Sequence, residues 1–457
     1  MRRGAAALSA MAASADAPAP VFVSRPDLRL PPLEILTSAG AVAPGLILLA
    51  PYNAPGVQAG ALIVDNLASP VWEQPLANRV TTDFRVQSFR GSPVLTWWEG
   101  VIRYGHGVGR YVIADTAYVP IARVDAGNGR RGDLHEFLIT DRGTALLTSY
   151  VIVEQDLSAV GGAARGTIQD AMFQEVDISS GRVLLEWRSL DHIPITDSYW
   201  PVGADWDYVH LNSIAVDSDG NLLVSARNTH TIYKLDRASG AVMWRMGGKR
   251  SGFEIASDAA FAWQHDARRQ PDGAISVFDN GDGGASRALL LDIDEHGRRV
   301  GLRSSFTRPS ATFADSQGNV QVLPNGNVFV GWGAKPYVSE FAPSGELVFD
   351  AQIGAPSISY RAYRAPWASA GAGAPAVAAR RAGSHTDVYV SWNGDTRVAR
   401  WTALAASGAN AVLRPLAPVA RSGFETVLEV PAAVTRLRAL GSDANGRTLA
   451  TSALVRV

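Results

Sequence analysis

Short runs of apolar, mostly β-branched residues alternate with polar turns along most of the chain, from about residue 46 to residue 355. Many of the turns are Asp-Gly, Asn-Gly or Ser-Gly pairs, which favour tight reversals between strands. Long stretches with the helical spacing of apolar residues are scarce. The pattern therefore predicts an all-β fold built from many short strands.

The strand pattern also repeats. Four phrases share one order of residue types: "HEFLITDRGTALLTSY" from His135, "HLNSIAVDSDGNLLVSARN" from His210, "HDARRQPDGAISVFDNG" from His265 and "GNVQVLPNGNVFVGWG" from Gly318. Each has an opening residue, an apolar strand, a turn that ends in glycine and a second strand. A closing phrase such as "TIYKLDRASGAVMWRMG" follows each one, and two looser units precede the four. Six units of four strands predict a six-bladed β-propeller over residues 21–366.

The composition changes near residue 366. The stretch "APWASAGAGAPAVAARRAGS" is rich in Ala, Gly and Pro and predicts a linker over residues 367–383. Alternating strands return over residues 384–457, which predicts a small immunoglobulin-like β-sandwich. Residues 1–20 are Ala-rich, and they are either a leader or an export signal whose centre is poor in leucine and valine.

Charge and composition narrow the choice of partners. A net charge of -1 gives no reason to expect nucleic acid or an anionic membrane surface. The absence of cysteine excludes disulfides, a thiol nucleophile and cysteine-based metal sites. No apolar run has the length of a membrane span. A small-molecule site on the propeller is therefore the main functional expectation.

Three of the eight histidines occupy the same position in successive units, namely His135, His210 and His265. The innermost strand of each propeller blade lines the central channel, so equivalent strand starts converge on one point. Arg287 and Arg227 are candidate cations beside them. Imidazoles supply nucleophilic and acid–base groups, and guanidinium groups bind tetrahedral oxyanions. This set indicates transfer or hydrolysis of a sulfuryl or phosphoryl group, unless each histidine only caps a channel-lining strand.

The phrases "GDLHEFLITDRGTALLTSY", "DWDYVHLNSIAVDSDGNLLVSARNTHTIYKLD", "WQHDARRQPDGAISVFDNG" and "SQGNVQVLPNGNVFVGWG" together resemble the arylsulfotransferase family. The likeness covers most of the chain and is closest to the branch found in actinobacteria and fungi. The resemblance implies a secreted or cell-envelope enzyme that moves a sulfuryl group from a phenolic sulfate ester to a phenol through a sulfated histidine. It implies no need for the nucleotide donor PAPS, for another cofactor or for a metal.

The resemblance places His210, His265 and Arg287 on the family's motif, with His135 as a further catalytic candidate. We expect His265 to be the nucleophile, because its neighbour Asp266 offers an orienting carboxylate. The remaining substrate-binding candidates are Arg227, Asn212, Asp266 and Asn280. The stretch "GGKRS" lacks the Ser/Thr and the glycine spacing of a phosphate-binding loop.

One departure from the family pattern leaves an alternative open. The family's nucleophilic histidine lies downstream of the third phrase, but no histidine occurs here between His296 and His385, and Arg308 precedes Pro309 where His-Pro is expected. The chain is then either an enzyme with another nucleophile or a non-catalytic secreted propeller that binds a ligand or protein. A calcium-assisted hydrolase is a third reading, based on "DSDGN" and "DNGDGG", although neither loop ends in the glutamate that calcium loops use.

Overall fold

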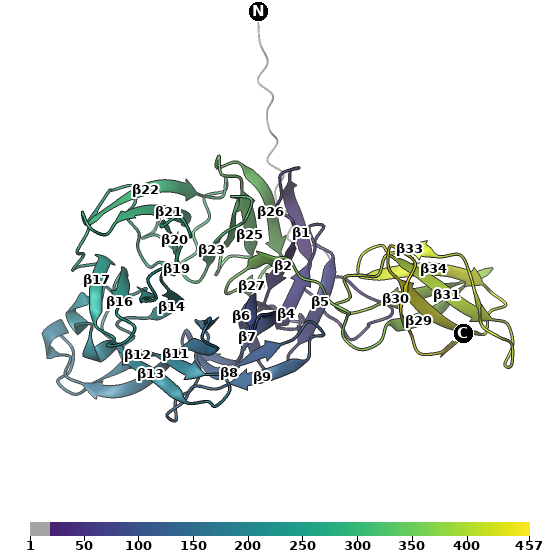
Figure 1. Cartoon of the computed structure of the whole chain (residues 1–457), viewed down its shortest axis with the longest axis horizontal. Helices are drawn as coiled ribbons and strands as arrows, with labels where there is room; N and C mark the ends of the chain where they lie inside the picture. The colour runs from purple at the N-terminus through teal and green to yellow at the C-terminus, as the bar shows by residue number, and fades with distance from the viewer. Residues whose placement is uncertain (1–18) are drawn as a thin grey trace, which may run out of the picture.

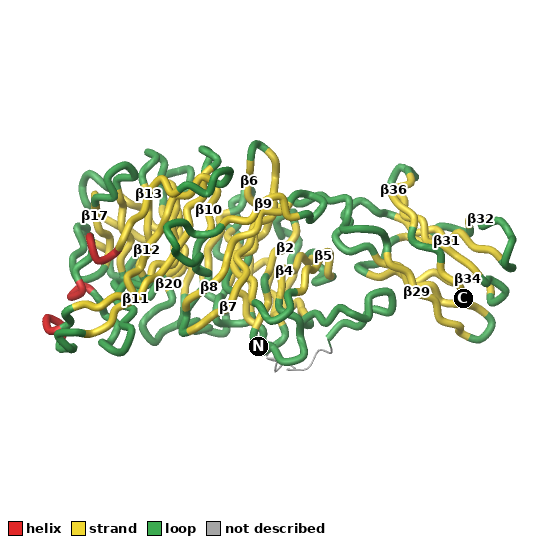
Figure 2. The backbone as a smooth tube through the Cα atoms, turned by 90° about the horizontal axis from the view of Figure 1, so that it is seen from below, coloured by secondary structure: helices red, strands yellow, loops and turns green. Residues whose placement is uncertain are grey.

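A computed structural model describes residues 19–457, so residues 1–18 of the predicted leader lie outside the described residues. The all-β prediction is confirmed: strands and loops make up nearly all of the described chain (Figure 2). The helical turns in this part of the chain are the short 3-10 segments η1 (Ser158–Val160), η2 (Ser189–Asp191) and η3 (Ile195–Asp197). Within residues 19–457, no helix has both the length and the apolar character needed to cross a membrane.

Antiparallel sheets follow one another along the chain between residues 33 and 365, and each has four principal strands. The first three sheets contain β28 (Tyr363–Ala365), β2 (Leu46–Leu49), β4 (Gly60–Val64) and β5 (Pro70–Pro75); β6 (Val80–Phe89), β7 (Ser92–Arg103), β8 (His106–Ala114) and β9 (Pro120–Val124); and β10 (Phe137–Ile139), β11 (Thr144–Gln155), β12 (Gly166–Asp177) and β13 (Val183–Arg188).

The next three sheets contain β14 (Leu211–Val216), β15 (Leu222–Ala226), β16 (Thr231–Leu235) and β17 (Val242–Gly247); β19 (His265–Arg269), β20 (Ile275–Asp279), β21 (Arg287–Asp294) and β22 (Arg299–Phe306); and β23 (Asn319–Val322), β24 (Val328–Gly331), β25 (Tyr337–Phe341) and β26 (Leu347–Ile353). Two strands extend them at the outer edge: β18 (Glu254–Ile255) pairs with β22, and β1 (Leu33–Ser38) pairs with β26. A short ladder joins β3 (Pro51–Tyr52) to β27 (Ile358–Ser359).

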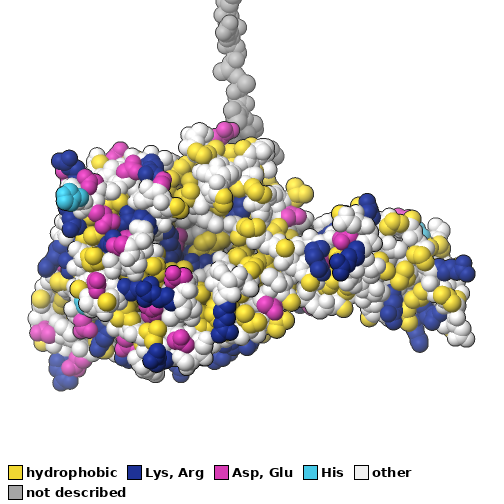
Figure 3. Space-filling view, in the orientation of Figure 1, with side chains coloured by type: hydrophobic (Ala, Val, Ile, Leu, Met, Phe, Trp, Pro, Cys, Tyr) yellow, Lys and Arg dark blue, Asp and Glu magenta, His cyan; other side chains and the backbone are white. Residues whose placement is uncertain are grey.

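The sheets are arranged as a ring around a central opening, with strands such as β14, β19 and β23 nearest the centre and β13, β17 and β22 at the outside (Figure 1). We call residues 33–365 the ring. Segments far apart in sequence close it, because β28 pairs antiparallel with β2 in the first sheet. The visible face of the ring is hollowed at its centre, and charged side chains of both signs are interspersed over it (Figure 3).

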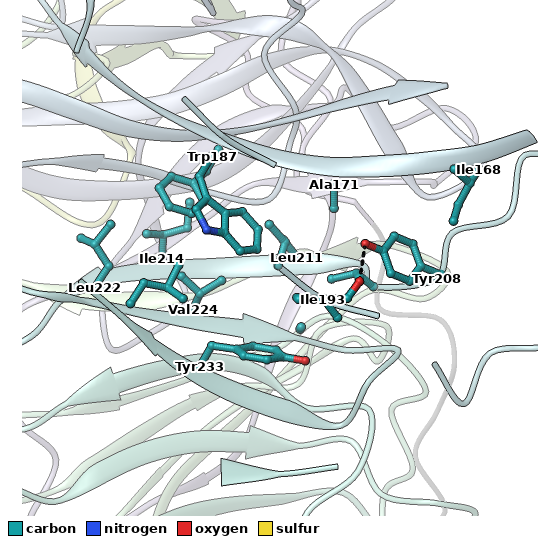
Figure 4. Packing of buried hydrophobic residues seen from close by; sticks show 14 of the residues in the cluster. Ile168, Ala171, Trp187, Ile193, Tyr208, Leu211, Ile214, Leu222, Val224 and Tyr233 are labelled. Carbon is teal, nitrogen blue, oxygen red and sulfur yellow. Dashed lines mark hydrogen bonds between the residues drawn. The ribbon is translucent and has the colours of Figure 1, made fainter. Parts of the chain in front are cut away.

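Apolar side chains fill the space between neighbouring sheets. Between the third and fourth sheets, Trp187 of β13 packs with Leu211 of β14 and Val224 of β15 in one buried cluster (Figure 4). Burying each such side chain stabilises the fold by roughly 1.5–3 kcal/mol. In the same cluster the Tyr208 hydroxyl donates a hydrogen bond to the Ile193 carbonyl at 3.2 Å, which satisfies its buried polar group. Both residues belong to the segment between β13 and β14, so this hydrogen bond joins the two ends of that segment.

The C-terminal unit consists of two further sheets around its own core, which includes Trp401 and Val388. One sheet is formed by β29 (Ala376–Ala382), β30 (His385–Ser391) and β34 (Glu425–Pro431); the other by β31 (Arg400–Ala406), β32 (Arg414–Pro415), β33 (Val419–Ala420), β35 (Arg436–Ser442), β36 (Thr448–Thr451) and β37 (Val455–Arg456). The expected linker over 367–383 therefore differs from the structure, since it contains β29. The sequence of this strand is mostly alanine and arginine, so it lacks the β-branched residues that indicate a strand. Its backbone nevertheless pairs with β30 along its whole length.

Candidate functional site

A cavity of about 800 Å³ lies on the ring, and its lining includes His135, His210, His265, Arg227 and Tyr360. The three histidines come from the segments that enter the inner strands of three successive sheets. The backbone at His210 has a φ of 54°, in the left-handed region that bulky residues rarely adopt. The local backbone is therefore strained where this side chain enters the cavity, as is frequent at functional sites.

Two of the imidazoles are held by carboxylates. His135 Nδ1 contacts Asp133 Oδ1, and His210 Nδ1 contacts Asp207 Oδ2. A carboxylate accepts a hydrogen bond, so Nδ1 carries the proton in each ring and Nε2 keeps a lone pair. The two ring centroids are 4.7 Å apart. The cavity thus holds two neighbouring imidazoles whose Nε2 atoms are suited to nucleophilic or acid–base work.

His106 is a further member of the cluster that the sequence analysis missed. Its Nε2 lies 3.1 Å from Asp207 Oδ2, and its ring centroid lies 5.2 Å from that of His210. It is the first residue of β8, in one of the looser repeat units, and it does not occupy the repeated position of His135, His210 and His265. The flanking "GHG" was an available signal: Gly105 has a φ of +83°, and a Cβ on Gly107 would lie 2.6 Å from the Leu134 nitrogen. Glycine at these two positions allows the hairpin to place the His106 ring close to the ring of His210.

His265 has a different environment, because both of its ring nitrogens are engaged by neutral groups. Nδ1 lies 2.7 Å from Asn280 Oδ1 and 3.1 Å from the Trp263 carbonyl, and Nε2 accepts a hydrogen bond from the Gln317 backbone at 3.2 Å. Burial holds the pKa of His265 well below its ordinary value. This imidazole is therefore neutral, and its lone pair is directed at a backbone N–H.

Arg227 supplies positive charge to the cavity, and Arg79, which also lines it, is paired with Glu99. The guanidinium of Arg227 donates to Asn228 Oδ1 at 2.8 Å and to the Asp315 carbonyl at 2.9 Å, and its buried Nε has no partner. Among the described residues, no carboxylate lies within 4.0 Å of this guanidinium. Its centre lies 4.8 Å from the centroid of the Trp263 ring. A half-buried arginine that is not paired with an acid and whose Nε lacks a partner is suited to an oxyanion.

Burial and neighbouring charges set the titration of the cluster. Burial lowers the pKa of His210 to about 4, although Asp207 opposes this. Burial works against ionisation of Asp207 too, but His210 and His106 outweigh it and hold the pKa of Asp207 below its usual range. His106 shows the reverse balance: burial lowers its pKa, but the hydrogen bond to Asp207 prevails and raises it. Near neutral pH the cluster therefore has an ionised Asp207 and a neutral His210.

Two predicted site residues lie elsewhere. Arg287 is not among the described residues that line the cavity, because its guanidinium donates to Asp279 Oδ2 at 2.7 Å and to the Ala260 carbonyl at 2.8 Å. Asp266 does not contact the ring of His265: its Oδ1 lies 2.7 Å from an Arg268 nitrogen. The structure thus differs from the expected roles of Arg287 as the oxyanion cation and of Asp266 as the orienting carboxylate.

The predicted amide residues Asn212 and Asn280 are buried next to the cavity and do not line it. Asn212 donates from Nδ2 to the Gln264 carbonyl at 2.7 Å, and its Oδ1 is buried without a partner. Asn280 fixes His265 and donates to the Ala314 carbonyl at 2.8 Å. Both side chains are buried, so they connect neighbouring segments of the ring and do not line the cavity.

Asp266 belongs to a network of buried charges next to the cavity. Arg361 lies at its centre, 2.8 Å from Asp83, 3.4 Å from Glu136 and 3.5 Å from Asp266. All four side chains are almost fully buried, so each charge depends on the others for compensation. Arg361 also donates to the Asn212 carbonyl at 2.8 Å, which joins this network to the segment that follows His210.

Two overlapping groups have ligand atoms close enough together to hold a metal ion: His106, Asp207 and His210, and His106, Asp133 and His135. In both groups the shortest contacts join a carboxylate to Nδ1, which is the geometry of a hydrogen bond. The two loops that resemble calcium sites have other partners. Asp217 is paired with Lys234 and Arg269, and Asp279 is paired with Arg287.

A family model described as "Arylsulfotransferase (ASST)" matches residues 85–354, which include the cavity histidines and Arg227. These residues are more than half of the chain, and the protein belongs to the arylsulfotransferase family. Membership supports an aryl-sulfotransferase type of function. No curated protein matches the sequence.

Several solved structures are similar in shape at low sequence identity. A protein of unknown function from Bacteroides caccae is 13% identical, and the match covers 70% of this chain and 98% of that one with a TM-score of 0.43. A catalytically inactive virginiamycin B lyase from Staphylococcus aureus with quinupristin is 9% identical, with 80% and 97% covered and a TM-score of 0.36. A protein from Lactobacillus plantarum is 12% identical, with 84% and 99% covered and a TM-score of 0.37.

Proposed function

We propose that the protein is a PAPS-independent aryl sulfotransferase of the actinobacterial and fungal type. It moves a sulfuryl group from a phenolic sulfate ester to an acceptor phenol through a sulfohistidine, and it acts as a secreted or cell-envelope protein. Its scaffold is a six-bladed propeller followed by an immunoglobulin-like sandwich. The observation that carries the proposal is the shared cavity of Arg227, a cation without an acidic partner, and His210, an imidazole held by a carboxylate.

His210 is the nucleophile in this proposal, in place of His265. The lone pair of His210 Nε2 forms a bond to sulfur while the bond between sulfur and the aryl oxygen breaks. Arg227 compensates the charge on the three sulfuryl oxygens, and the leaving phenolate takes a proton from the imidazolium form of His135. Asp207 holds the tautomer of His210 that leaves Nε2 free and stabilises the positive ring that forms.

The second half of the reaction reverses these roles. The acceptor phenol gives its proton to His135 while its oxygen forms a bond to sulfur, and the N–S bond breaks to return the electron pair to His210 Nε2. No net proton is gained or lost over the two steps. His265 positions the Gln317 backbone at the cavity wall, and transfer prevails over hydrolysis to the extent that the aryl group excludes water.

The test is a mass spectrum of the protein after brief incubation with 4-nitrophenyl sulfate. We expect the mass of one sulfuryl group on His210 in the wild type and in His265→Ala, and no such adduct in His210→Ala. A circular dichroism spectrum checks that both variants fold. An adduct that persists in His210→Ala and disappears in His265→Ala would assign the nucleophile to His265.

The second candidate is a non-catalytic secreted propeller that binds a ligand or a protein partner. The observation that favours it is the missing downstream histidine. Arg308, which stands in its place, is buried and paired with Asp350 at 2.6 Å. A wild-type protein that neither acquires the adduct nor transfers sulfate from 4-nitrophenyl sulfate to phenol would establish this candidate.

A further inference from the structure

A second, smaller cavity of about 300 Å³ meets the central one at His210 and Arg227, which line both. Its other walls include Tyr104, Trp200, Trp206, Asp205 and Asp207. We call it the side pocket. It lies between the β7–β8 hairpin and the segment that joins β13 to β14.

The rim of the side pocket is aromatic and exposed. Tyr104 is 98% exposed and Trp200 is 44% exposed, although large aromatic side chains normally avoid water. Trp200 is held in place, because its ring meets the Trp263 ring edge-on at 5.8 Å and its carbonyl accepts a hydrogen bond from Trp206 Nε1 at 3.1 Å. Exposed apolar surface on a fixed framework at the mouth of a cavity is characteristic of a site for a flat apolar group.

The polar groups of the side pocket select for a hydrogen-bond donor. Asp207 Oδ1 is buried and has no partner, whereas Oδ2 of the same carboxylate contacts two imidazoles. A buried carboxylate oxygen without a donor costs free energy that a ligand hydroxyl can recover. Asp205 adds a second negative charge to the wall. A neutral phenol can donate to Asp207 Oδ1, whereas a sulfate ester has no donor for this oxygen and would meet the carboxylates of Asp205 and Asp207 beside Arg227.

We infer that the side pocket binds the aromatic ring of the acceptor phenol, with the ring against Trp200 and the hydroxyl donating to Asp207 Oδ1. The larger cavity then takes the aryl group of the sulfate donor. This assignment rests on the proposed function and adds to it that the two substrates have separate aryl sites that meet at His210. When transfer occurs, the hydroxyl turns from Asp207 towards the sulfuryl group and its proton passes to His135.

The experiment measures binding in the absence of turnover. Phenol and phenyl sulfate are each titrated calorimetrically into three proteins that carry His210→Gln and cannot form the adduct: one without a further change, one with Trp200→Ala and the control with Tyr199→Ala. Tyr199 is an exposed aromatic residue beside Trp200 that lines neither cavity. We expect the dissociation constant of phenol to rise about tenfold in Trp200→Ala only, since an aromatic contact is lost. The dissociation constant of phenyl sulfate should stay unchanged in all three proteins.

Steady-state kinetics give a second readout. The KM for phenol should rise in Trp200→Ala, while the KM for 4-nitrophenyl sulfate stays constant. Unchanged phenol binding in Trp200→Ala, or an equal loss for both ligands, would overturn the side-pocket assignment. A loss confined to phenyl sulfate would assign the pocket to the donor and overturn it as well. Phenol binding that depends on Trp200 in a protein without sulfuryl transfer would retain the subsite and overturn the proposed enzyme instead.

Discussion

The carboxylate of Asp207 contacts Nδ1 of His210, so one acidic side chain fixes which nitrogen of that imidazole faces the reaction. The same oxygen also lies 3.1 Å from Nε2 of His106. Asp207 thus joins a histidine of the repeat pattern to one outside it, and the pair depends on a single carboxylate for orientation.

Replacing Asp207 with Asn should slow formation of the adduct on His210 by on the order of 100-fold, because an amide neither fixes the tautomer as firmly nor stabilises the positive ring. Rapid-quench mass spectrometry with 4-nitrophenyl sulfate measures the rate. Asp156→Asn, an exposed acid that lines neither cavity, is the control and should react at the wild-type rate. Equal rates in Asp207→Asn and wild type would remove the carboxylate from the mechanism.

Arg227→Met should reduce kcat/KM for the sulfate donor by about 10²–10³-fold, the usual cost of removing one group that stabilises a developing oxyanion. Arg287→Ala is the comparison, because its guanidinium is occupied by Asp279 outside the cavity. We expect that variant to keep its activity within a few fold. The opposite ranking would restore the role that the sequence motif gives to Arg287.

The reaction should tolerate acid. Burial lowers the pKa of His210 from an ordinary value of 6.5 to about 4, so its neutral, nucleophilic form persists well below neutral pH. With 4-nitrophenyl sulfate, whose phenolate leaves without needing the proton of His135, the rate of adduct formation should therefore be nearly constant from pH 7 to about pH 5.5 and fall by half near pH 4. A single-turnover series over this range tests it, and a decline centred near pH 6.5 would contradict it.

The same shift predicts how stability depends on pH. In the unfolded chain His210 binds a proton near pH 6.5, whereas in the folded protein it stays neutral down to about pH 4. The unfolded state thus binds more protons in this interval, and the free energy of unfolding falls as the pH drops from 6.5 to 4. Urea unfolding at several pH values measures this, and His210→Gln should show a smaller decline.

Arg361→Leu should lower the free energy of unfolding by about 3–5 kcal/mol, because Arg85 and Arg268 remain but one of the buried negative charges is left uncompensated. The control is Arg165→Ala, which removes an 81% exposed partner of Glu154 and should cost less than about 1 kcal/mol. Chemical denaturation of both variants provides the comparison. Similar small effects in the two variants would show that Arg361 is not needed to hold the network together.

The sequence predicted the strands well because turns and alternation are local signals. The register of His135, His210 and His265 was also visible, since a repeated fold puts repeated positions on one axis. The roles of the individual side chains could not be predicted from the sequence. His265 and Asp266 are adjacent in sequence, but the left-handed backbone at Asp266 sends their side chains to different partners, one to Asn280 and the other to Arg268.

The roles of Arg287 and His106 were also missed, and both depend on the three-dimensional structure. Arg287 follows the family motif, but a carboxylate eight residues earlier neutralises it. His106 lies outside the repeated phrases and reaches the site only because the hairpin around Gly105 and Gly107 is tight enough. Pairing of charges and close backbone approach are three-dimensional properties that a pattern of residue types does not record.

The strand that closes the ring is also the last part of it to be synthesised. β28 begins two residues after Arg361 and pairs with β2, which the ribosome makes more than three hundred residues earlier. Tyr360, whose ring meets that of His135 edge-on at 5.6 Å, is part of the cavity wall and lies just before β28 in the chain. A chain released early would thus lack both the closing strand and one wall of the site. The histidine cavity is therefore complete only once the last strand of the ring has been made, and the C-terminal unit follows it in the chain.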